Sequence, residues 1–189
     1  MISAIILAAG KSTRMGQQKM LMPWGETTVI ESVIQTLKLA TINDIILVTN
    51  PTIARQIPQQ EIQVTVNDTG EMIESLKTGL RALKPSAEAA LICLGDQPQA
   101  EVGSVRSVCE AFHKSRSKLI FPSYQMRRGH PWLVARPLWN EILAVAAAQS
   151  PRDFLNSHAS EIEYVTINTP TILQDIDTPE DYLKYKPPL

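Results

Sequence analysis

The chain has 189 residues, of which 44% are hydrophobic and 20% are charged, and its formal net charge at pH 7 is −1. This size and composition predict one globular domain over residues 1–189, and the lack of a basic excess argues against a nucleic-acid partner. The apolar N-terminal run is too short to span a membrane and carries no basic leader, so we expect a cytoplasmic protein without a membrane partner.

The first strand opens into a basic, glycine-bounded loop. Residues 2–8 (I-S-A-I-I-L-A) predict a short buried strand, followed by A-G-K-S-T-R-M-G over residues 9–16 and then by Lys19. Glycine lets backbone N–H groups approach phosphate oxygens, and Arg14 and Lys19 supply positive charge. The spacing matches neither the Walker A loop nor the dinucleotide-binding fingerprint. The loop is therefore either an anion-binding loop for a nucleotide or an ordinary turn with solvated basic side chains.

Helices and strands then alternate along the chain. A Ser/Thr-x-x-Glu pattern at residues 28–31 predicts the start of a helix whose apolar residues recur at helical spacing. Further strands are predicted at 44–49, 61–66, 89–94 and 118–121, and further helices at 71–83 and 102–113. The helix over 71–83 is expected to bury Met72, Leu76, Leu80 and Leu83 on one face. The alanine-rich stretch 144–148 is the expected end of a helix, and another helix is expected to begin at residues 150–151.

This alternation predicts the fold class. Near-continuous apolar strands separated by helices are typical of an α/β fold, with a Rossmann-like, mostly parallel sheet covered by helices on both faces. Right-handed crossovers bring the loops at the carboxyl ends of the strands to one edge of the sheet. We therefore expect the loops 9–19 and 95–99 to lie at the same edge.

Three polar motifs follow later in the chain, and each has an ordinary structural explanation as well as a functional one. Asp96 in G-D-Q-P is either a turn former or a metal carboxylate, and His130 in R-G-H-P is either a hydrogen-bonded structural residue or part of a binding site. In D-I-D-T-P-E-D, a helix N-terminus accounts for residues 178–181 but not for Asp175 or Asp177.

The loop sequence L-A-A-G-K-S-T-R-M-G-Q-Q-K (residues 7–19), together with the G-D-Q-P, G-H-P and D-I-D-T-P-E-D segments, resembles a known family. It is similar to the molybdenum cofactor cytidylyltransferases, a molybdopterin nucleotidyltransferase family of the NTP-transferase superfamily, from Leu7 to Tyr182. The resemblance implies a single nucleotidyltransferase domain with a glycosyltransferase-A-like fold. It also implies that Arg14 and Lys19 bind phosphates, and that Asp96 and Asp177 hold Mg²⁺.

The resemblance divides the candidate site residues into three groups. The residues implied to bind the nucleotide are Leu7, Ala8, Ala9, Gly10, Arg14, Lys19, Asn67 and Ser75. The residues implied to be catalytic are Arg14, Lys19 and Asp96, and those implied to bind the acceptor are Gly129, His130 and Arg152. Apart from the resemblance, Arg127 and Arg128 are either ligands of an acceptor phosphate or ordinary solvated surface arginines. The chain departs from the family pattern at Glu71, where glycine is usual, and in residues 150–153, where only Arg152 matches.

The implied reaction is the transfer of CMP from CTP to the phosphate of a molybdopterin-type molybdenum cofactor, with release of pyrophosphate. L-A-A-G and G-H-P together favour CTP over GTP. A molybdoenzyme or its maturation factor is an additional expected partner. Two alternatives remain open: a sugar- or polyol-phosphate nucleotidyltransferase, and a non-catalytic carrier or maturation partner for the molybdenum cofactor.

Overall fold

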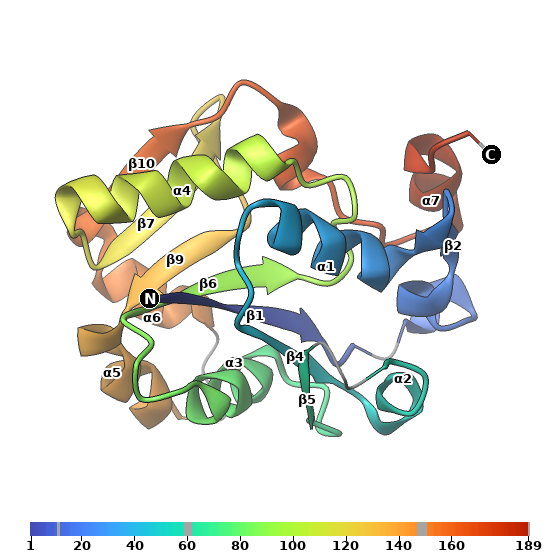
Figure 1. The fold of residues 1–189 in the computed structure, drawn as a ribbon, viewed down its shortest axis with the longest axis horizontal. Helices are drawn as coiled ribbons and strands as arrows, with labels where there is room; N and C mark the ends of the chain where they lie inside the picture. Colours follow the sequence, from blue (N-terminus) through green and yellow to red (C-terminus); the bar gives the residue numbers. More distant parts are fainter. Residues whose placement is uncertain (11, 59–61, 147–150, 189) are drawn as a thin grey trace.

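A computed structural model describes residues 1–10, 12–58, 62–146 and 151–188 of the chain (Figure 1). The strands are β1 (Ile2–Ala8), β2 (Pro23–Trp24), β3 (Thr27–Thr28), β4 (Ile45–Thr49), β5 (Gln63–Val66), β6 (Ala89–Leu94), β7 (Leu119–Tyr124), β8 (Arg127–Arg128), β9 (Trp132–Ala135) and β10 (Ile162–Thr166). The helices are α1 (Val29–Leu39), α2 (Pro51–Ala54), α3 (Met72–Ala82), α4 (Val102–Ser115), α5 (Trp139–Ala144), α6 (Pro151–Ser157) and α7 (Pro179–Tyr185).

The large sheet has the strand order β10-β7-β9-β6-β1-β4-β5, and β8 pairs with β7. The pairs β1–β4, β1–β6, β4–β5 and β10–β7 are parallel. β9 runs antiparallel to both of its neighbours, because the short connection from β7 through β8 reverses the chain without a crossover helix. The predicted α/β fold with a mostly parallel sheet is confirmed.

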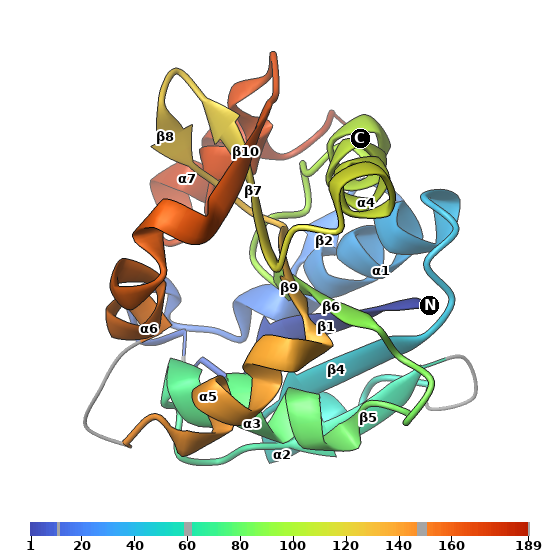
Figure 2. The same ribbon diagram turned by 90° about the vertical axis from the view of Figure 1, so that its left-hand side faces the viewer.

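Helices cover both faces of this sheet, with α1 and α4 on one side and α3 and α5 on the other (Figure 2). The alternation of side chains along β1 supplies both apolar layers: Ile6 packs with residues of α1, whereas Ile5 packs with residues of α3. Among the described residues, no helix is both long and apolar enough to cross a membrane.

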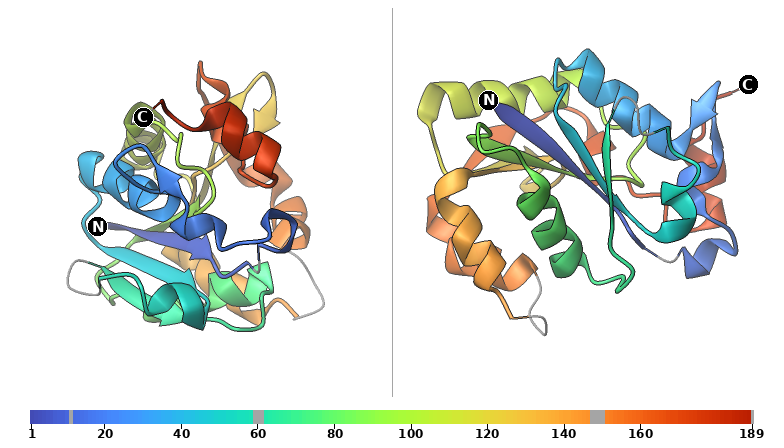
Figure 3. Two further views of the ribbon diagram at one scale, coloured as in Figure 1. Left: turned by 90° about the vertical axis from the view of Figure 1, so that its right-hand side faces the viewer. Right: turned by 60° about the horizontal axis from the view of Figure 1, so that its bottom comes forward.

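The C-terminal helix α7 lies beside β2, as labelled in Figure 1 and seen from two further sides in Figure 3, although the two are far apart in the sequence. Thr178 caps α7 by accepting a hydrogen bond from the Asp181 N–H at 3.2 Å, as the sequence predicted. The Tyr182 hydroxyl donates to the Pro23 carbonyl at 2.6 Å, and its ring lies 6.3 Å from the ring of Trp24. These contacts hold the segment that precedes α7 against the N-terminal part of the chain.

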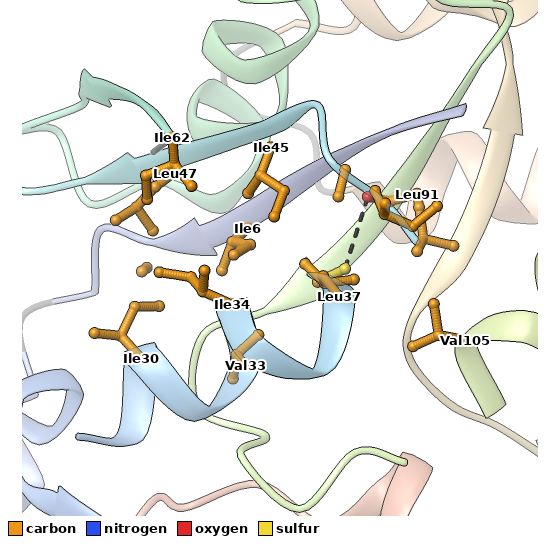
Figure 4. Packing of buried hydrophobic residues seen from close by; sticks show 14 of the residues in the cluster. Ile6, Ile30, Val33, Ile34, Leu37, Ile45, Leu47, Ile62, Leu91 and Val105 are labelled. Carbon is orange, nitrogen blue, oxygen red and sulfur yellow. Dashed lines mark hydrogen bonds between the residues drawn. The ribbon is translucent and has the colours of Figure 1, made fainter. Parts of the chain in front are cut away.

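Helix α1 shows how the apolar pattern produces this packing. The predicted capping box is present, since the Thr28 N–H donates to the Glu31 carboxylate at 2.8 Å and the Glu31 N–H donates to the Thr28 hydroxyl at 3.4 Å. Ile30, Val33 and Leu37 are buried toward β1, β4 and β6, as Figure 4 shows. The apolar stripe predicted for this helix is therefore its contact with the sheet.

Some predicted boundaries differ from the structure. β7 extends to Tyr124 and α4 to Ser115, beyond the ends predicted at 121 and 113, and β10 and α2 were not predicted. β5 begins at Gln63, because Ile62 forms a bend and is not part of the strand, and residue 61 lies outside the described residues. α5 ends at Ala144 and α6 begins at Pro151, and the expectations for residues 147–148 and 150 also lie outside the described residues.

The prediction that Met72 belongs to the buried face of its helix is wrong. Met72 is 52% exposed, whereas Ile73, Leu76 and Leu80 of α3 are buried. The true stripe therefore begins one residue later, about 100° around the helix. Met72 instead faces open space at the carboxyl edge of the sheet, where it lines two cavities.

Gly79→Ala is expected to destabilise the fold by about 1–3 kcal/mol, the usual cost of overpacking a core. Gly79 of α3 lies against the sheet, and an added Cβ would collide with the Ile5 side chain and lie 3.2 Å from that of Val48. Urea denaturation measures the effect. Gly103→Ala in α4 is the matched control: no atom lies within 4 Å of its added Cβ, so we expect a gain of up to about 1 kcal/mol from helix propensity. Equal effects of the two substitutions would contradict this packing.

Candidate active site

The loop that leaves β1 is built from two short turns. Residues Thr13–Met15 and Lys19–Leu21 each form a 3-10 helix. Gly16 has φ +65, which glycine adopts without strain, and Ser12 also has a positive φ of 49. A Cβ placed on Gly10 would meet no atom within 4 Å. Gly10 is thus not required for internal packing, and its backbone is open to a close approach by a ligand.

This loop forms one wall of a cavity of about 380 Å³, here called the first cavity. Its other walls come from the ends of β1 and β6, the start of α3 and the segment before α7. The cavity brings together nearly all of the predicted nucleotide and metal residues: Leu7, Ala8, Ala9, Gly10, Arg14, Lys19, Ser75, Asp96 and Asp177. The expectation that loops 9–19 and 95–99 share one edge of the sheet is confirmed.

Lys19 lies at the centre of the charged groups in this cavity. Its Nζ donates to Asp96 Oδ2 at 2.6 Å, to Asp177 Oδ1 at 3.1 Å and to the Ile176 carbonyl at 2.9 Å. Lys19 is only 7% exposed. Burial alone would lower the pKa of Lys19, but the two carboxylates outweigh it and raise that pKa above its ordinary value. The Lys19 side chain is therefore protonated at physiological pH and lies between two carboxylates.

Two further contacts join the loops that carry these carboxylates. The Ile176 N–H donates to the Asp96 carbonyl at 2.9 Å, and the buried Gln97 side chain donates from Nε2 to Asp175 Oδ1 at 2.6 Å. Asp175 also lines the first cavity, and burial raises its pKa. The sequence prediction had not given Asp175 a role, and the only signal for it was the acidic run itself.

Arg14 has a different character from Lys19. Its side chain is 75% exposed, and its Nη1 lies 3.8 Å from Asp177 Oδ2. An exposed ion pair at this distance stabilises little, so the guanidinium is free to reorient toward a bound anion.

Asn67 does not line the first cavity, although the sequence predicted that it binds the nucleotide. Its side-chain amide donates to the Ser75 hydroxyl at 2.8 Å and to the Glu71 carbonyl at 3.3 Å, and its Oδ1 accepts from the Thr69 N–H at 3.1 Å. Asn67 thus organises the turn before α3, while Ser75 reaches the cavity. Glu71 is exposed and immediately precedes α3, outside the residues that line the cavity.

A second cavity, of about 520 Å³, adjoins the first and shares Leu7 and Met72 with it. It contains the three residues predicted to bind an acceptor: Gly129, His130 and Arg152. Arg128, Phe121 and Trp132 also line it. Gly129 is required by packing, because an added Cβ would collide with the Ile172 carbonyl oxygen. The His130 N–H donates to that same carbonyl at 2.9 Å.

The carboxylates of the first cavity fit a hard divalent cation. Mg²⁺ prefers one or two carboxylates together with phosphate oxygens of a substrate. Asp96 and Asp177 supply such oxygens beside the loop, with side chains that are 19% and 49% exposed. Within the described ranges, no group of three or more His, Cys, Asp or Glu side chains could hold a metal. A cation here would therefore need ligand oxygens as well as the two carboxylates.

Burial lowers the pKa of His130 from 6.5 to about 4, so the imidazole in the second cavity is neutral at physiological pH. An unfolded chain takes up this proton near pH 6.5, which the folded chain does not do until about pH 4. Stability is therefore lost as pH falls through this window.

We expect wild type to lose about 3 kcal/mol more stability than His130→Gln between pH 6.5 and 4. Denaturant titrations across this range measure the difference. His158 cannot account for the loss, because hydrogen bonds with Glu161 and Glu141 raise its pKa, and its contribution therefore has the opposite sign. Parallel stability curves for the two proteins would show that His130 is not buried as described.

Several known proteins are similar to this chain. A model of the MobA-like NTP transferase domain matches residues 4–162. The chain is 31% identical to a molybdenum cofactor cytidylyltransferase of Escherichia coli, over 98% of this chain and 95% of that protein. A nucleotidyl transferase structure from Methanothermobacter has a TM-score of 0.83 at 24% identity, covering 98% of this chain and 96% of the other. A manganese complex of Rv0371c from Mycobacterium tuberculosis has a TM-score of 0.79 at 22% identity, covering 97% and 96%.

Proposed function

Because this chain belongs to the family of MobA-like NTP transferase domains, we propose that it transfers CMP from CTP to the phosphate of a molybdopterin-type molybdenum cofactor, releasing pyrophosphate. The observation that carries the proposal is the set of contacts that Lys19 makes with Asp96 and Asp177 in the first cavity. These contacts bring one ammonium group and two carboxylates together beside a loop whose backbone at Gly10 is accessible to a ligand. Triphosphate binding and metal binding both need such groups at one point.

The chain's own residues supply positioning and charge. Backbone N–H groups near Ala9 and Gly10 orient the nucleotide, while Arg14 and Lys19 neutralise the β- and γ-phosphates. Asp96 and Asp177 would hold Mg²⁺, which when bound neutralises charge that develops on the transferred phosphate. An acceptor phosphate oxygen attacks the α-phosphorus as the bond from that phosphorus to the β-phosphate oxygen breaks, and pyrophosphate leaves. Little covalent chemistry is asked of the protein, so in-line alignment accounts for most of the rate.

The second cavity supports a separate site for the acceptor. Its shared wall at Leu7 and Met72 brings it next to the first cavity, as an attack on a bound nucleotide requires. Its lining combines aromatic side chains with Arg128 and Arg152, which suits a flat ring system that carries a negative charge. Two features favour CTP and the molybdenum cofactor: the L-A-A-G sequence at residues 7–10 and the E. coli relative.

Pyrophosphate release with Mg²⁺ and molybdenum cofactor, compared for CTP, GTP, UTP and ATP, tests the proposal. Release that requires CTP and stops when the cation is chelated would support it. Release with GTP would keep the reaction but change the nucleotide. Cofactor binding without release from any nucleotide would favour a carrier or maturation partner, which hands the cofactor to a molybdoenzyme. A protein that does not bind the cofactor would point to sugar or polyol phosphates as acceptors.

A further inference from the structure

Two neighbouring arginines on β8 face different surroundings. Arg127 pairs with Tyr124 of β7, and Arg128 pairs with Ser123. Successive residues of a strand point to opposite faces, and of these two arginines only Arg128 lines the second cavity. β8 therefore presents one arginine to the cavity and one away from it.

Aromatic residues fix the Arg128 side chain in this position. Its Nε donates to the Tyr164 hydroxyl at 2.7 Å. Its guanidinium carbon lies 5.5 Å from the ring centroid of Tyr164 and 5.9 Å from that of Phe121. The sheet register explains the cluster, since β8 and β10 both pair with β7. Tyr164 of β10 lies opposite Phe121, and Arg128 lies opposite Ser123, two residues further along β7. The side chains of Phe121, Arg128 and Tyr164 thus lie on the same face of the sheet.

This arrangement leaves one edge of the guanidinium for a ligand. The bond to Tyr164 uses only Nε, and within the described part of the chain no protein group bonds to Nη1 or Nη2 of Arg128. A planar guanidinium matches the geometry of a phosphate and binds two of its oxygens at once. An arginine that is already held in place loses less side-chain entropy on binding.

We propose that Arg128 binds the phosphate of the acceptor, and that Tyr164 is a positioning residue that holds the Arg128 guanidinium at the second cavity. This inference rests on the proposed function, because it takes the second cavity to be the acceptor site. It assigns the two roles to residues that lie 36 positions apart in the sequence and meet only through the pairing of β7 with β8 and β10.

Initial rates of pyrophosphate release at saturating CTP and varied molybdopterin test the assignment. Arg128→Ala is expected to raise the KM for molybdopterin by about 10- to 100-fold, which corresponds to the loss of hydrogen bonds to a charged group. Tyr164→Phe keeps the ring but loses the hydroxyl, so a rise of roughly 3- to 10-fold is expected. The KM for CTP should not change in either variant. Arg127→Ala is the matched control and should leave both KM values unchanged.

Inhibition by inorganic phosphate is a second measurement. It would not change if Arg128 and Tyr164 had only structural roles. Inorganic phosphate should compete with molybdopterin in wild type, and its inhibition constant should rise in Arg128→Ala and Tyr164→Phe. An unchanged KM for molybdopterin in Arg128→Ala would overturn the assignment. A rise without any change in phosphate inhibition, or an equal rise in Arg127→Ala, would also overturn it.

Equilibrium binding separates failure of this inference from failure of the proposed function. Tryptophan fluorescence, to which Trp132 in the second cavity contributes, reports molybdopterin binding to the nucleotide-free protein. If wild type binds molybdopterin but releases no pyrophosphate, the transferase function is wrong. Weaker binding by Arg128→Ala would still support the inference in that case, and equal binding would refute it. A wild type that binds neither molybdopterin nor inorganic phosphate would overturn both.

Discussion

Replacing Lys19 by methionine is expected to lower kcat/KM for nucleotidyl transfer by roughly 100-fold or more, the usual cost of removing one preorganised stabilising group. Methionine keeps the aliphatic part of the buried side chain but removes the ammonium group that contacts Asp96 and Asp177. Pyrophosphate release at varied CTP measures the loss.

The same substitution should tighten the binding of Mn²⁺ to the nucleotide-free protein. It removes a positive charge from between two carboxylates, so a divalent cation no longer competes with the lysine for them. Calorimetric titration with Mn²⁺ tests this opposite effect. Weaker or unchanged Mn²⁺ binding would mean that Lys19 does not compete with a metal ion for the two carboxylates.

Lys77→Met is the matched control for Lys19→Met. Lys77 is also buried, and its Nζ donates to the Val145 carbonyl at 2.6 Å and to Glu74 at 2.9 Å, but it lines neither cavity. We expect lower stability and unchanged kcat/KM. An equal loss of turnover in the two variants would trace the effect of Lys19 to folding.

Asp96→Asn is expected to lower kcat/KM by a similar factor, about 100-fold or more, but to weaken Mn²⁺ binding rather than tighten it. The amide has nearly the same shape as the carboxylate but carries no charge, so both the ion pair with Lys19 and the proposed metal ligand are lost. Steady-state kinetics and Mn²⁺ titration of one protein preparation measure both effects.

Asp44→Asn provides the control for Asp96→Asn. Asp44 immediately precedes β4, at the opposite end of the sheet, where it accepts from the Ser3 hydroxyl at 2.6 Å and pairs with Lys84 at 2.6 Å. Its substitution should affect stability only. Wild-type turnover in Asp96→Asn would exclude this residue from the catalytic site, and lost turnover in Asp44→Asn would show that the assay reports folding.

Opposite metal-binding effects from Lys19→Met and Asp96→Asn would identify the Lys19–Asp96 pair as the centre of the site. The two side chains are in direct contact, so their effects on kcat/KM should not be additive. The double variant should lose less than the product of the two single losses. Full additivity would mean that the two groups act independently.

The sequence by itself determined the features that depend on neighbouring residues. The strand over residues 2–8, the helix cap at Thr28 and the cap at Thr178 are local patterns, and each has the predicted form. The loop motif over residues 7–19 predicted one side of the first cavity, because this continuous segment supplies more than half of the residues that line it. The alternation of apolar strands and helices was sufficient to predict a mostly parallel sheet with two covered faces.

The tertiary structure decided what depends on distant partners. Lys19 meets Asp96 across 77 positions and Asp177 across 158, so no local pattern could show that its ammonium group lies between the two carboxylates. Asn67 turned inward because the Ser75 hydroxyl lies within its reach, whereas Met72 faces the cavities because the buried stripe of α3 begins one residue later. Strand order and crossovers decide which distant side chains meet and which face of α3 is exposed. The spacing of residues along the sequence does not give these positions in space.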